Sequence, residues 1–289
     1  MKITYIFLFI SFLSYSQNKK SFEKYNQFQQ KAMLDFKDKK YETALLNFQK
    51  AIDLKPRENV TTYFYATAAA LNTNNMNKAK ELLIASIHQT NASKEYFLNF
   101  KEFDNFRNQK LFTEIENNYE NYITEFYKNL EHPKIYKEID SLFAIDQKVR
   151  KNKSDWREVS KIDSLNINRL IEITKKYGWQ KKGWLLLWHQ RGTYNQDNYI
   201  WNFFKPYIDK QILEGNIEKS FWTRFEDQNS IRNSKKQIYG LYWGQFDQFP
   251  IKDIKNVDKR RVENGLPPLW YMEKIYGIKL PSDYKRTKL

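Results

Sequence analysis

One histidine of this chain lies where an imidazole can take part in chemistry. The chain has three histidines, and only His189 directly follows an apolar run, Trp-Leu-Leu-Leu-Trp over residues 184–188. A helix over this run would bury its leucine and tryptophan side chains and place His189 at the edge of the core. Because the pKa of histidine lies near neutral pH and shifts with its surroundings, His189 is a candidate general base. The alternative is a core histidine whose ring nitrogens are satisfied by hydrogen bonds.

Asp146, Gln147 and Arg150 form a second group of candidates. A helix would place Asp146 and Arg150 one turn apart, where a surface ion pair contributes about 0.3–0.5 kcal/mol. With Gln147 beside them, they can instead line a polar pocket in which Arg150 presents its planar guanidinium group to a carboxylate or a phosphate. We therefore predict Asp146 as a catalytic partner of His189, and Gln147 and Arg150 as ligand-binding residues.

A short polar loop, Gln237-Ile-Tyr-Gly240, supplies the last candidates. Gly240 permits a backbone conformation that other residues avoid, while Gln237 and Tyr239 offer hydrogen-bond donors and acceptors. We predict that both side chains bind the ligand, and an ordinary turn is the alternative.

Several chemistries are excluded by residue type. The 289 residues include no cysteine, which removes disulfides, thiolate metal ligands and a cysteine nucleophile. The chain also lacks the HExxH zinc helix, the Walker phosphate loop, the GxGxxG loop and the GxSxG nucleophile elbow. A metal site would have to combine His189 with aspartates that no spacing rule connects to it: Asp146, Asp163 or Asp227. We expect no metal and no cofactor.

The candidates lie in a C-terminal domain that is predicted to be mainly helical (residues 131–280), followed by a tail (residues 281–289). Its start is marked by His132-Pro133, because proline disfavours helix in the residue before it. Near the end of this domain, Asp258 is expected to cap the start of a short helix. Apolar residues recur at helical spacing elsewhere, and glycine residues mark helix ends. The expected helices cover residues 134–150, 156–177, 184–190, 198–213 and 217–227.

The N-terminal part, residues 17–130, has the pattern of helical hairpins. Small residues that let two helices approach closely alternate with aromatic residues that fill the space between them, and a proline ends the second helix. These residues are Phe28, Ala32, Phe36, Tyr41, Ala44, Phe48, Ala51 and Pro56. Their spacing resembles a tetratricopeptide repeat, which implies an αα-hairpin and a concave surface for a peptide or protein.

The same frame moved by 35 residues gives a weaker second copy, with Asn72–Asn75 in the turn between its helices. The matching positions are Tyr63, Thr67, Ala70, Met76, Ala79, Leu83, Ser86 and Asn91. Residues 95–128 are expected to be helical and to cover the last apolar face with Phe103, Phe106 and Phe112, because a repeat array needs a closing element. A spacer that supports the C-terminal domain is the alternative to a binding groove.

A set of short motifs follows in order along residues 135–277. They are Asp146-Gln147 with Arg150, Asp163 with Asn166, Tyr177-Gly178-Trp179, the apolar run into His189, Gln237-Ile-Tyr-Gly240, and Asp258–Leu269. Together they resemble a bacterial family of uncharacterised domains that occurs in exported proteins, sometimes behind tetratricopeptide repeats. The chain departs from the family at Asp227-Gln228, where members usually carry Asp-Arg. It also departs at Trp188-His189-Gln190-Arg191, where members usually carry a Gln-His pair followed by an acidic residue. The resemblance implies a shared pocket but no particular activity.

Residues 1–16 are predicted to be a signal peptide. Lys2 precedes the apolar run Ile3–Leu13, and Ser14 and Ser16 stand at the −3 and −1 positions of a cleavage site. The run is shorter than the about 20 residues that span a bilayer, and an uncleaved membrane anchor is the alternative. No later stretch reaches that length. We expect an exported protein, in the periplasm or on the outer surface of a Gram-negative bacterium.

The net charge of +15 also raises the question of a nucleic-acid partner. The lysines are spread over the whole chain without a basic block, which is typical of a solvated surface, so we expect no nucleic acid. The predicted fold is all-α: a short tetratricopeptide-like solenoid joined to a mainly helical domain. The predicted function is a protein or peptide interaction module of the cell envelope. Two alternatives stay open: a cofactor-free hydrolase or transferase with its pocket around His189, Asp146 and Arg150, and sugar or peptidoglycan binding through exposed aromatic residues.

Overall fold

A computed structural model describes residues 22–54, 59–151 and 155–286. Within these ranges the chain is all-α, as predicted, and none of their residues lies in a β-strand apart from one isolated bridge between Gln237 and Ile251. The predicted signal peptide and Pro56 lie outside the described residues. None of the helices in the described ranges is both long enough and apolar enough to cross a membrane.

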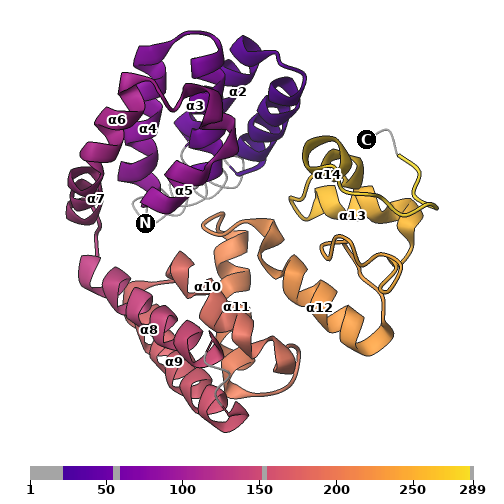
Figure 1. Ribbon diagram of the computed structural model, residues 1–289. Helices are drawn as coiled ribbons and strands as arrows, with labels where there is room; N and C mark the ends of the chain where they lie inside the picture. The colour runs from indigo at the N-terminus through magenta and orange to yellow at the C-terminus, as the bar shows by residue number, and fades with distance from the viewer. Residues whose placement is uncertain (1–21, 55–58, 152–154, 287–289) are drawn as a thin grey trace, which may run out of the picture. The chain divides into compact units, whose positions relative to one another are not determined.

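The chain forms two compact units that do not follow the order of the sequence (Figure 1). Unit 1 contains the residues up to Asn129, together with Leu213–Glu218 and Gly265–Lys279. Unit 2 contains Leu130–Ile212, Lys219–Asn264 and the residues from Leu280 onward. The first change of unit therefore lies close to the predicted junction at His132-Pro133. By contrast, residues 265–279, which we expected in the C-terminal domain, are part of unit 1.

Unit 1 is built from consecutive helices that pack on their neighbours. Helix α3 contacts both α2 and α4, and α4 also contacts α6 and α7. The elements are a first helix over residues 22–37, α2 (Tyr41–Leu54), α3 (Val60–Asn72), α4 (Met76–Thr90), α5 (Lys94–Asn99), the 3₁₀ turn η1 (Lys101–Phe106), α6 (Lys110–Asn117) and α7 (Tyr119–Lys128).

The local sequence explains where these helices begin and how closely they pack. Asn59 caps α3 by accepting a hydrogen bond from the backbone N–H of Thr61 at 3.0 Å, and Asn75 caps α4 in the same way. The predicted turn over Asn72–Asn75 is confirmed. Most residues that we placed between helices are buried: Ala32, Phe36, Ala44, Phe48, Ala51, Tyr63, Thr67, Ala70, Ala79, Leu83 and Ser86.

An aromatic cluster follows the hairpins. Phe103 is fully buried, and its ring centroid lies 5.2 Å from that of Phe64 and 5.4 Å from that of Phe112. Phe112 is buried as well, whereas Phe106 is only half-buried. The predicted covering of the last apolar face therefore rests on Phe103 and Phe112.

Helix α14 (Leu269–Tyr276) belongs to unit 1 although it lies near the end of the chain. Its residues Leu269, Tyr271, Met272 and Ile275 are buried. Polar contacts tie the same segment to the first helix and the turn after it: the Lys274 ammonium group lies 2.7 Å from a carboxylate oxygen of Asp38, and Asn26 donates a hydrogen bond to the Gly265 carbonyl oxygen.

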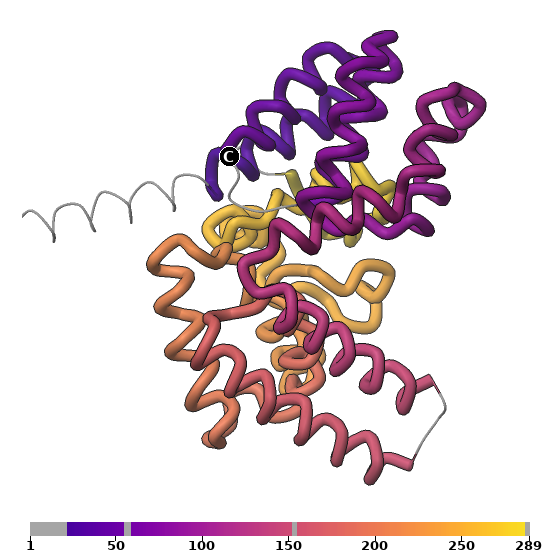
Figure 2. The backbone as a smooth tube through the Cα atoms, turned by 90° about the vertical axis from the view of Figure 1, so that its left-hand side faces the viewer, coloured from indigo at the N-terminus to yellow at the C-terminus, as the bar shows by residue number. Residues whose placement is uncertain are grey.

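Unit 2 starts with two long helices that lie side by side and are followed by shorter elements (Figure 2). The helices are α8 (Pro133–Lys151), α9 (Trp156–Tyr177), α10 (Trp184–His189), α11 (Tyr199–Leu213), α12 (Thr223–Ser234) and α13 (Val257–Glu263). The 3₁₀ turns are η2 (Lys181–Gly183), η3 (Gln190–Thr193), η4 (Lys219–Trp222) and η5 (Ile254–Asn256).

The expected helices of this unit are present, with two differences. The predicted helix over 217–227 is a 3₁₀ turn followed by α12, which continues to Ser234. The prediction that Asp258 caps a helix is wrong, because Asn256 holds the N-cap position of α13 and Asp258 lies in its first turn. The Asp258 carboxylate is buried and accepts a hydrogen bond from the Tyr284 hydroxyl at 2.6 Å. The local sequence does not predict this contact, because the two residues are 26 positions apart.

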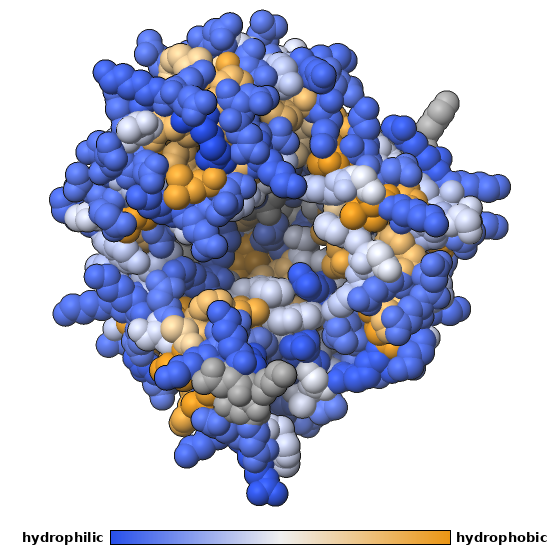
Figure 3. Space-filling view, viewed as in Figure 1, coloured by the Kyte–Doolittle hydropathy of each residue, from blue (hydrophilic) through white to orange (hydrophobic). Residues whose placement is uncertain are grey.

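Helix α10, the apolar run before His189, packs closely against α9. A Cβ atom on Gly183, directly before α10, would lie 2.5 Å from Leu170 Cδ1, so a larger residue at this position would require the Leu170 side chain to shift. Leu186 and Leu187 are buried, while Trp184 and Trp188 stack on each other with ring centroids 5.4 Å apart. The outer surface in the view of Figure 3 is mostly hydrophilic, in keeping with a buried core in each unit.

Candidate functional site

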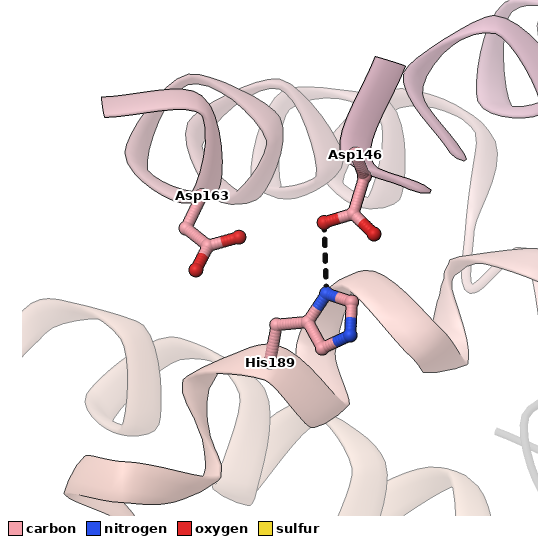
Figure 4. A group of neighbouring side chains, drawn as sticks. All are labelled: Asp146, Asp163 and His189. Atoms are coloured by element: carbon pink, nitrogen blue, oxygen red, sulfur yellow. Dashed lines mark hydrogen bonds and ion pairs between the residues drawn. The ribbon is translucent and has the colours of Figure 1, made fainter. Parts of the chain in front are cut away.

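Three helices of unit 2 bring the predicted catalytic residues together. Helix α8 carries Asp146, Gln147 and Arg150, helix α9 carries Asp163, and α10 ends at His189 (Figure 4). The α8–α9 pair and the packing of α10 against both helices fix the distances between these side chains. The structure brings His189, Asp146 and Arg150 together, as the alternative of a pocket around these residues requires.

Asp146 is the centre of this cluster. Its side chain is 1% exposed, and its Oδ1 atom lies 2.8 Å from His189 Nδ1 and 3.2 Å from Arg150 Nη2. Gln147 donates to the other oxygen, Oδ2, at 2.7 Å. Arg150 also bridges to Asp163 on the neighbouring helix. A buried carboxylate needs such partners, and Asp146 has a charged or polar donor on each oxygen.

The hydrogen bond to Asp146 determines which nitrogen of His189 can act as a base. A carboxylate only accepts, so Nδ1 carries the proton of the neutral ring, and Nε2 retains its lone pair. Figure 4 shows Nε2 on the side of the ring that faces away from Asp146. Within the described residues, the only polar contact of His189 is the one through Nδ1. Nε2 is therefore left for a ligand or water.

The surroundings keep this imidazole neutral. Burial is the largest cause and lowers the pKa of His189 below its ordinary value, because a buried ring loses the hydration of its charged form. The Asp146 carboxylate opposes this shift, and the Arg150 guanidinium adds to it. A lowered pKa provides the unprotonated base at neutral pH.

The same residues have donor atoms that can hold a metal ion. One ligand atom from each of Asp146, Asp163 and His189 lies within 4.8 Å of the others. The Arg150 guanidinium already contacts both carboxylates, and His189 Nδ1 donates to one of them. A divalent ion at this point would have to displace the positive charge that Arg150 supplies. The residues therefore fit an arginine-bridged pair of carboxylates better than a metal centre.

A pocket of about 450 Å³ opens beside the cluster. It is lined by residues from α8, α9, α10, η3 and α12, namely Arg150, Asp163, His189, Arg191, Gly192, Gln228 and Arg232. This volume suits a small molecule. The pocket thus combines an unprotonated imidazole with three guanidinium groups.

Arg191 is the most unusual of these cations. Its guanidinium group lies 4.8 Å from the centroid of the Trp188 ring and donates to the Trp188 carbonyl oxygen at 3.2 Å. Burial lowers the pKa of Arg191, and the nearby charge of Arg150 acts in the same direction. Arg191 forms no ion pair with a carboxylate in the described ranges.

Gln237 and Tyr239, which we predicted to bind the ligand, do not line this pocket. Gln237 is fully buried and uses its amide to hold the loop, donating to Phe249 O at 2.8 Å and accepting from Tyr242 N at 2.8 Å. The Tyr239 hydroxyl donates to Glu226 at 2.6 Å. Both side chains shape a loop rather than a ligand site, as the alternative of an ordinary turn proposed.

This loop is organised by Asp227, which is fully buried. Its Oδ1 accepts the backbone N–H groups of Ile238 and Tyr239, at 2.5 and 2.7 Å, and its Oδ2 accepts that of Leu241 at 2.8 Å. Burial raises the pKa of Asp227, while the three N–H groups and Arg261 oppose that rise. Asp227 therefore holds the loop, and it is not among the residues that line the pocket.

The residues that sequence reasoning missed are Arg191, Gln228 and Arg232. Arg191 stands two positions after His189, which is a local signal that a basic residue lies near the base. Gln228 and Arg232 reach the pocket from α12, and nothing in their own segment indicates it. Comparison with models of known protein families, with characterised proteins and with solved structures finds no match.

Proposed function

We propose that unit 2 is a hydrolase or group transferase that uses His189 as its acid–base residue. The observation that supports this proposal is the His189–Asp146 pair at the wall of the pocket, with Nε2 facing away from the carboxylate. In this proposal, Nε2 takes a proton from an attacking water or hydroxyl group. Asp146 then stabilises the imidazolium that forms, and a positioned base of this kind accelerates a reaction by about 10²- to 10⁴-fold.

The arginines would supply the second requirement of the reaction. Fixed positive charges stabilise negative charge that develops on a substrate in a site with limited access to water. Arg150 is held by two carboxylates and mainly positions them, whereas Arg191 has no such partner among the described residues. We assign substrate binding to Arg191 and orientation of the dyad to Arg150.

A panel of p-nitrophenyl carboxyl esters, phosphate monoesters and glycosides tests the proposal on the whole chain. We expect turnover of at least one class, lost in His189→Gln and reduced in Asp146→Asn. His132→Gln is the matched control, since His132 lies in the same unit with its ring against Tyr177. Reaction with diethyl pyrocarbonate, which acylates neutral imidazole, provides an independent measurement. The proposal would be wrong if no substrate is turned over and diethyl pyrocarbonate modifies His132 but not His189.

A separate observation favours a role in protein interaction for unit 1. The first helix, α2, α3 and α4 surround a groove of about 190 Å³ whose lining includes Tyr25, Gln49, Ile52 and Leu82. The buried Oε1 atom of Gln49 has no hydrogen-bond partner among the described residues. An unpaired acceptor of this kind suits a peptide N–H. We therefore keep peptide or protein binding by the tetratricopeptide-like hairpins, in an exported envelope protein, as a second proposal.

Two measurements test this second proposal. The chain without residues 1–16 is immobilised and exposed to a peptide library, with Gln49→Ala and Leu82→Glu as groove variants and Leu46→Glu, an exposed position, as the control. We expect peptides that the groove variants lose and the control retains. Mass spectrometry of the envelope fraction tests export, and an intact Met1 in the mature protein would contradict the predicted cleavage after Ser16.

A further inference from the structure

The charges around the pocket are not balanced by the chain itself. Arg150 contacts the carboxylates of both Asp146 and Asp163. Arg191 and Arg232, the other two guanidinium groups of the lining, form no ion pair with a carboxylate in the part of the chain that the structure describes. Two positive charges therefore face the pocket without a paired acid.

Both of these arginines keep donors free for a ligand. Arg191 donates to one acceptor, the Trp188 carbonyl oxygen, and Arg232 donates to the Gly192 carbonyl oxygen and to Asn229 Oδ1. A guanidinium group has five N–H donors, so each has several left. The contacts that are made fix the planes of the two groups relative to η3 and α12.

The surroundings of Arg191 favour an anion further. Arg224 lies on the same Trp188 ring, with its guanidinium carbon 5.3 Å from the ring centroid. Asp163 acts on Arg191 as a nearby charge rather than as an ion-pair partner. Arg191 is half-buried and Arg224 is exposed, and neighbouring cations that repel one another are stabilised when an anion enters between them.

We propose that the pocket binds a phosphate monoester, with Arg191 and Arg232 holding the phosphate group. Two unpaired cations match the charge of a phosphate monoester, which is close to −2 at pH 7, better than the single charge of a carboxylate or sulfate ester. Guanidinium groups also match phosphate oxygens with pairs of parallel hydrogen bonds.

This inference names the substrate class of the proposed function and rests on it for the chemical step. In hydrolysis, a water oxygen forms the new bond to phosphorus, and the P–O bond to the alcohol breaks. His189 Nε2 takes a proton from the water and passes it to the oxygen of the leaving alkoxide, which departs as the alcohol, so protons and charges balance.

Titration of the whole chain with phenyl phosphate and phenyl sulfate at pH 7.5 tests the inference. The two ligands have nearly the same shape and differ by one charge. Tryptophan fluorescence is a suitable signal because Trp188 lies under Arg191. We expect phenyl phosphate to bind at least about tenfold more tightly than phenyl sulfate, which corresponds to about 1.4 kcal/mol.

Variants assign the binding to the two arginines. Arg191→Gln and Arg232→Gln should each weaken phenyl phosphate binding by about tenfold or more. Arg157→Gln is the control, because Arg157 is exposed on the same unit and its side chain contacts the Trp156 ring. Arg191→Lys keeps the charge and serves as a second variant if Arg191→Gln proves unstable; we expect it to bind phenyl phosphate more weakly than the unmodified chain and more tightly than Arg191→Gln.

The outcomes separate this inference from the proposed function. Equal affinity for phenyl phosphate and phenyl sulfate, or equal losses in Arg191→Gln and Arg157→Gln, would overturn the phosphate assignment. If a carboxyl ester or a glycoside is turned over in a His189-dependent manner while phenyl phosphate does not bind, the inference fails and the proposed function stands. If phenyl phosphate binds through Arg191 and Arg232 but no ester or glycoside of the panel is hydrolysed, the ligand class stands and the proposed catalysis fails.

Discussion

His189 Nδ1 and Asp146 Oδ1 lie 2.8 Å apart although 43 positions separate the two residues. The same oxygen lies 3.2 Å from Arg150 Nη2, so one carboxylate oxygen serves both an imidazole and a guanidinium group. The carboxylate and the guanidinium act on the pKa of His189 in opposite directions. Substitution of either partner should therefore change the pKa of His189, which can be measured.

Asp146→Asn and Arg150→Gln should shift the pKa of His189 in opposite directions. Removal of the Asp146 charge lowers it further, because the protonated ring loses the carboxylate that favours it. Removal of the Arg150 charge raises it. Proton–carbon correlation spectra of the ring Cε1–H groups give the pKa directly, since only three histidines contribute signals. Shifts of the same sign in both variants would contradict the assigned electrostatics.

The stability of the chain should fall below pH 6.5 in part because of His189. Its pKa is lower in the folded chain than its ordinary value of 6.5, so the unfolded chain binds a proton first as the pH falls. This contribution is fully present above pH 6.5 and is lost as the pH falls through the lowered pKa. We expect urea unfolding at several pH values to show that the free energy of unfolding falls less steeply with decreasing pH in His189→Gln than in His132→Gln. Identical profiles would count against a buried neutral His189.

Asp227→Asn should destabilise the loop over residues 237–241 by about 2–4 kcal/mol. An amide has one acceptor oxygen where the carboxylate has two, so at least one of the three backbone N–H groups loses its partner. Asp247→Asn, at an exposed position close to the same loop, is the matched control and should change the free energy of unfolding by less than about 0.5 kcal/mol. A similar effect in both variants would show that Asp227 does not organise the loop.

Gly240→Ala should cost more than Gly244→Ala. Both glycines have positive φ, +70° and +76°, so both substitutions carry a backbone penalty of about 1 kcal/mol. A Cβ atom at Gly240 would also lie 2.7 Å from Ile251 Cδ1, whereas nothing lies within 4 Å of one at Gly244. The two variants are compared by thermal unfolding. We expect Gly240→Ala to lower the free energy of unfolding by about 1–2 kcal/mol more than Gly244→Ala, and this difference measures the clash.

Met272→Ala should loosen unit 1 although Met272 lies near the end of the chain. The side chain is 4% exposed and α14 belongs to unit 1, so its truncation should cost about 2–4 kcal/mol. Hydrogen exchange should rise in α2 and α3 and stay unchanged in α8 to α10. Glu273→Ala, the exposed neighbour on the same helix, is the control. Faster exchange confined to unit 2 would contradict the assignment of α14.

Local patterns in the sequence are sufficient to predict the all-α architecture and most helices of unit 2. Spacing of apolar residues, capping side chains and Gly178 are local signals, and they place α8, α9, α10 and α11 close to where the structure has them. The position of His189 directly after an apolar run likewise predicts a ring at the edge of a core. Local periodicity carries this information because each helix buries one face.

Which side chains meet depends on the packing of elements that are distant in the sequence. Asp163 and Arg232 come from helices far from His189 in the sequence, and they line one pocket because α10 packs on α9 and α12 packs on η3. Gln237 looked like a ligand-binding residue, but burial assigns its amide to the loop backbone. Likewise, α14 joins unit 1 because its apolar face is buried there. Contacts and pKa shifts depend on neighbours brought together by long-range packing, and local spacing does not encode those neighbours.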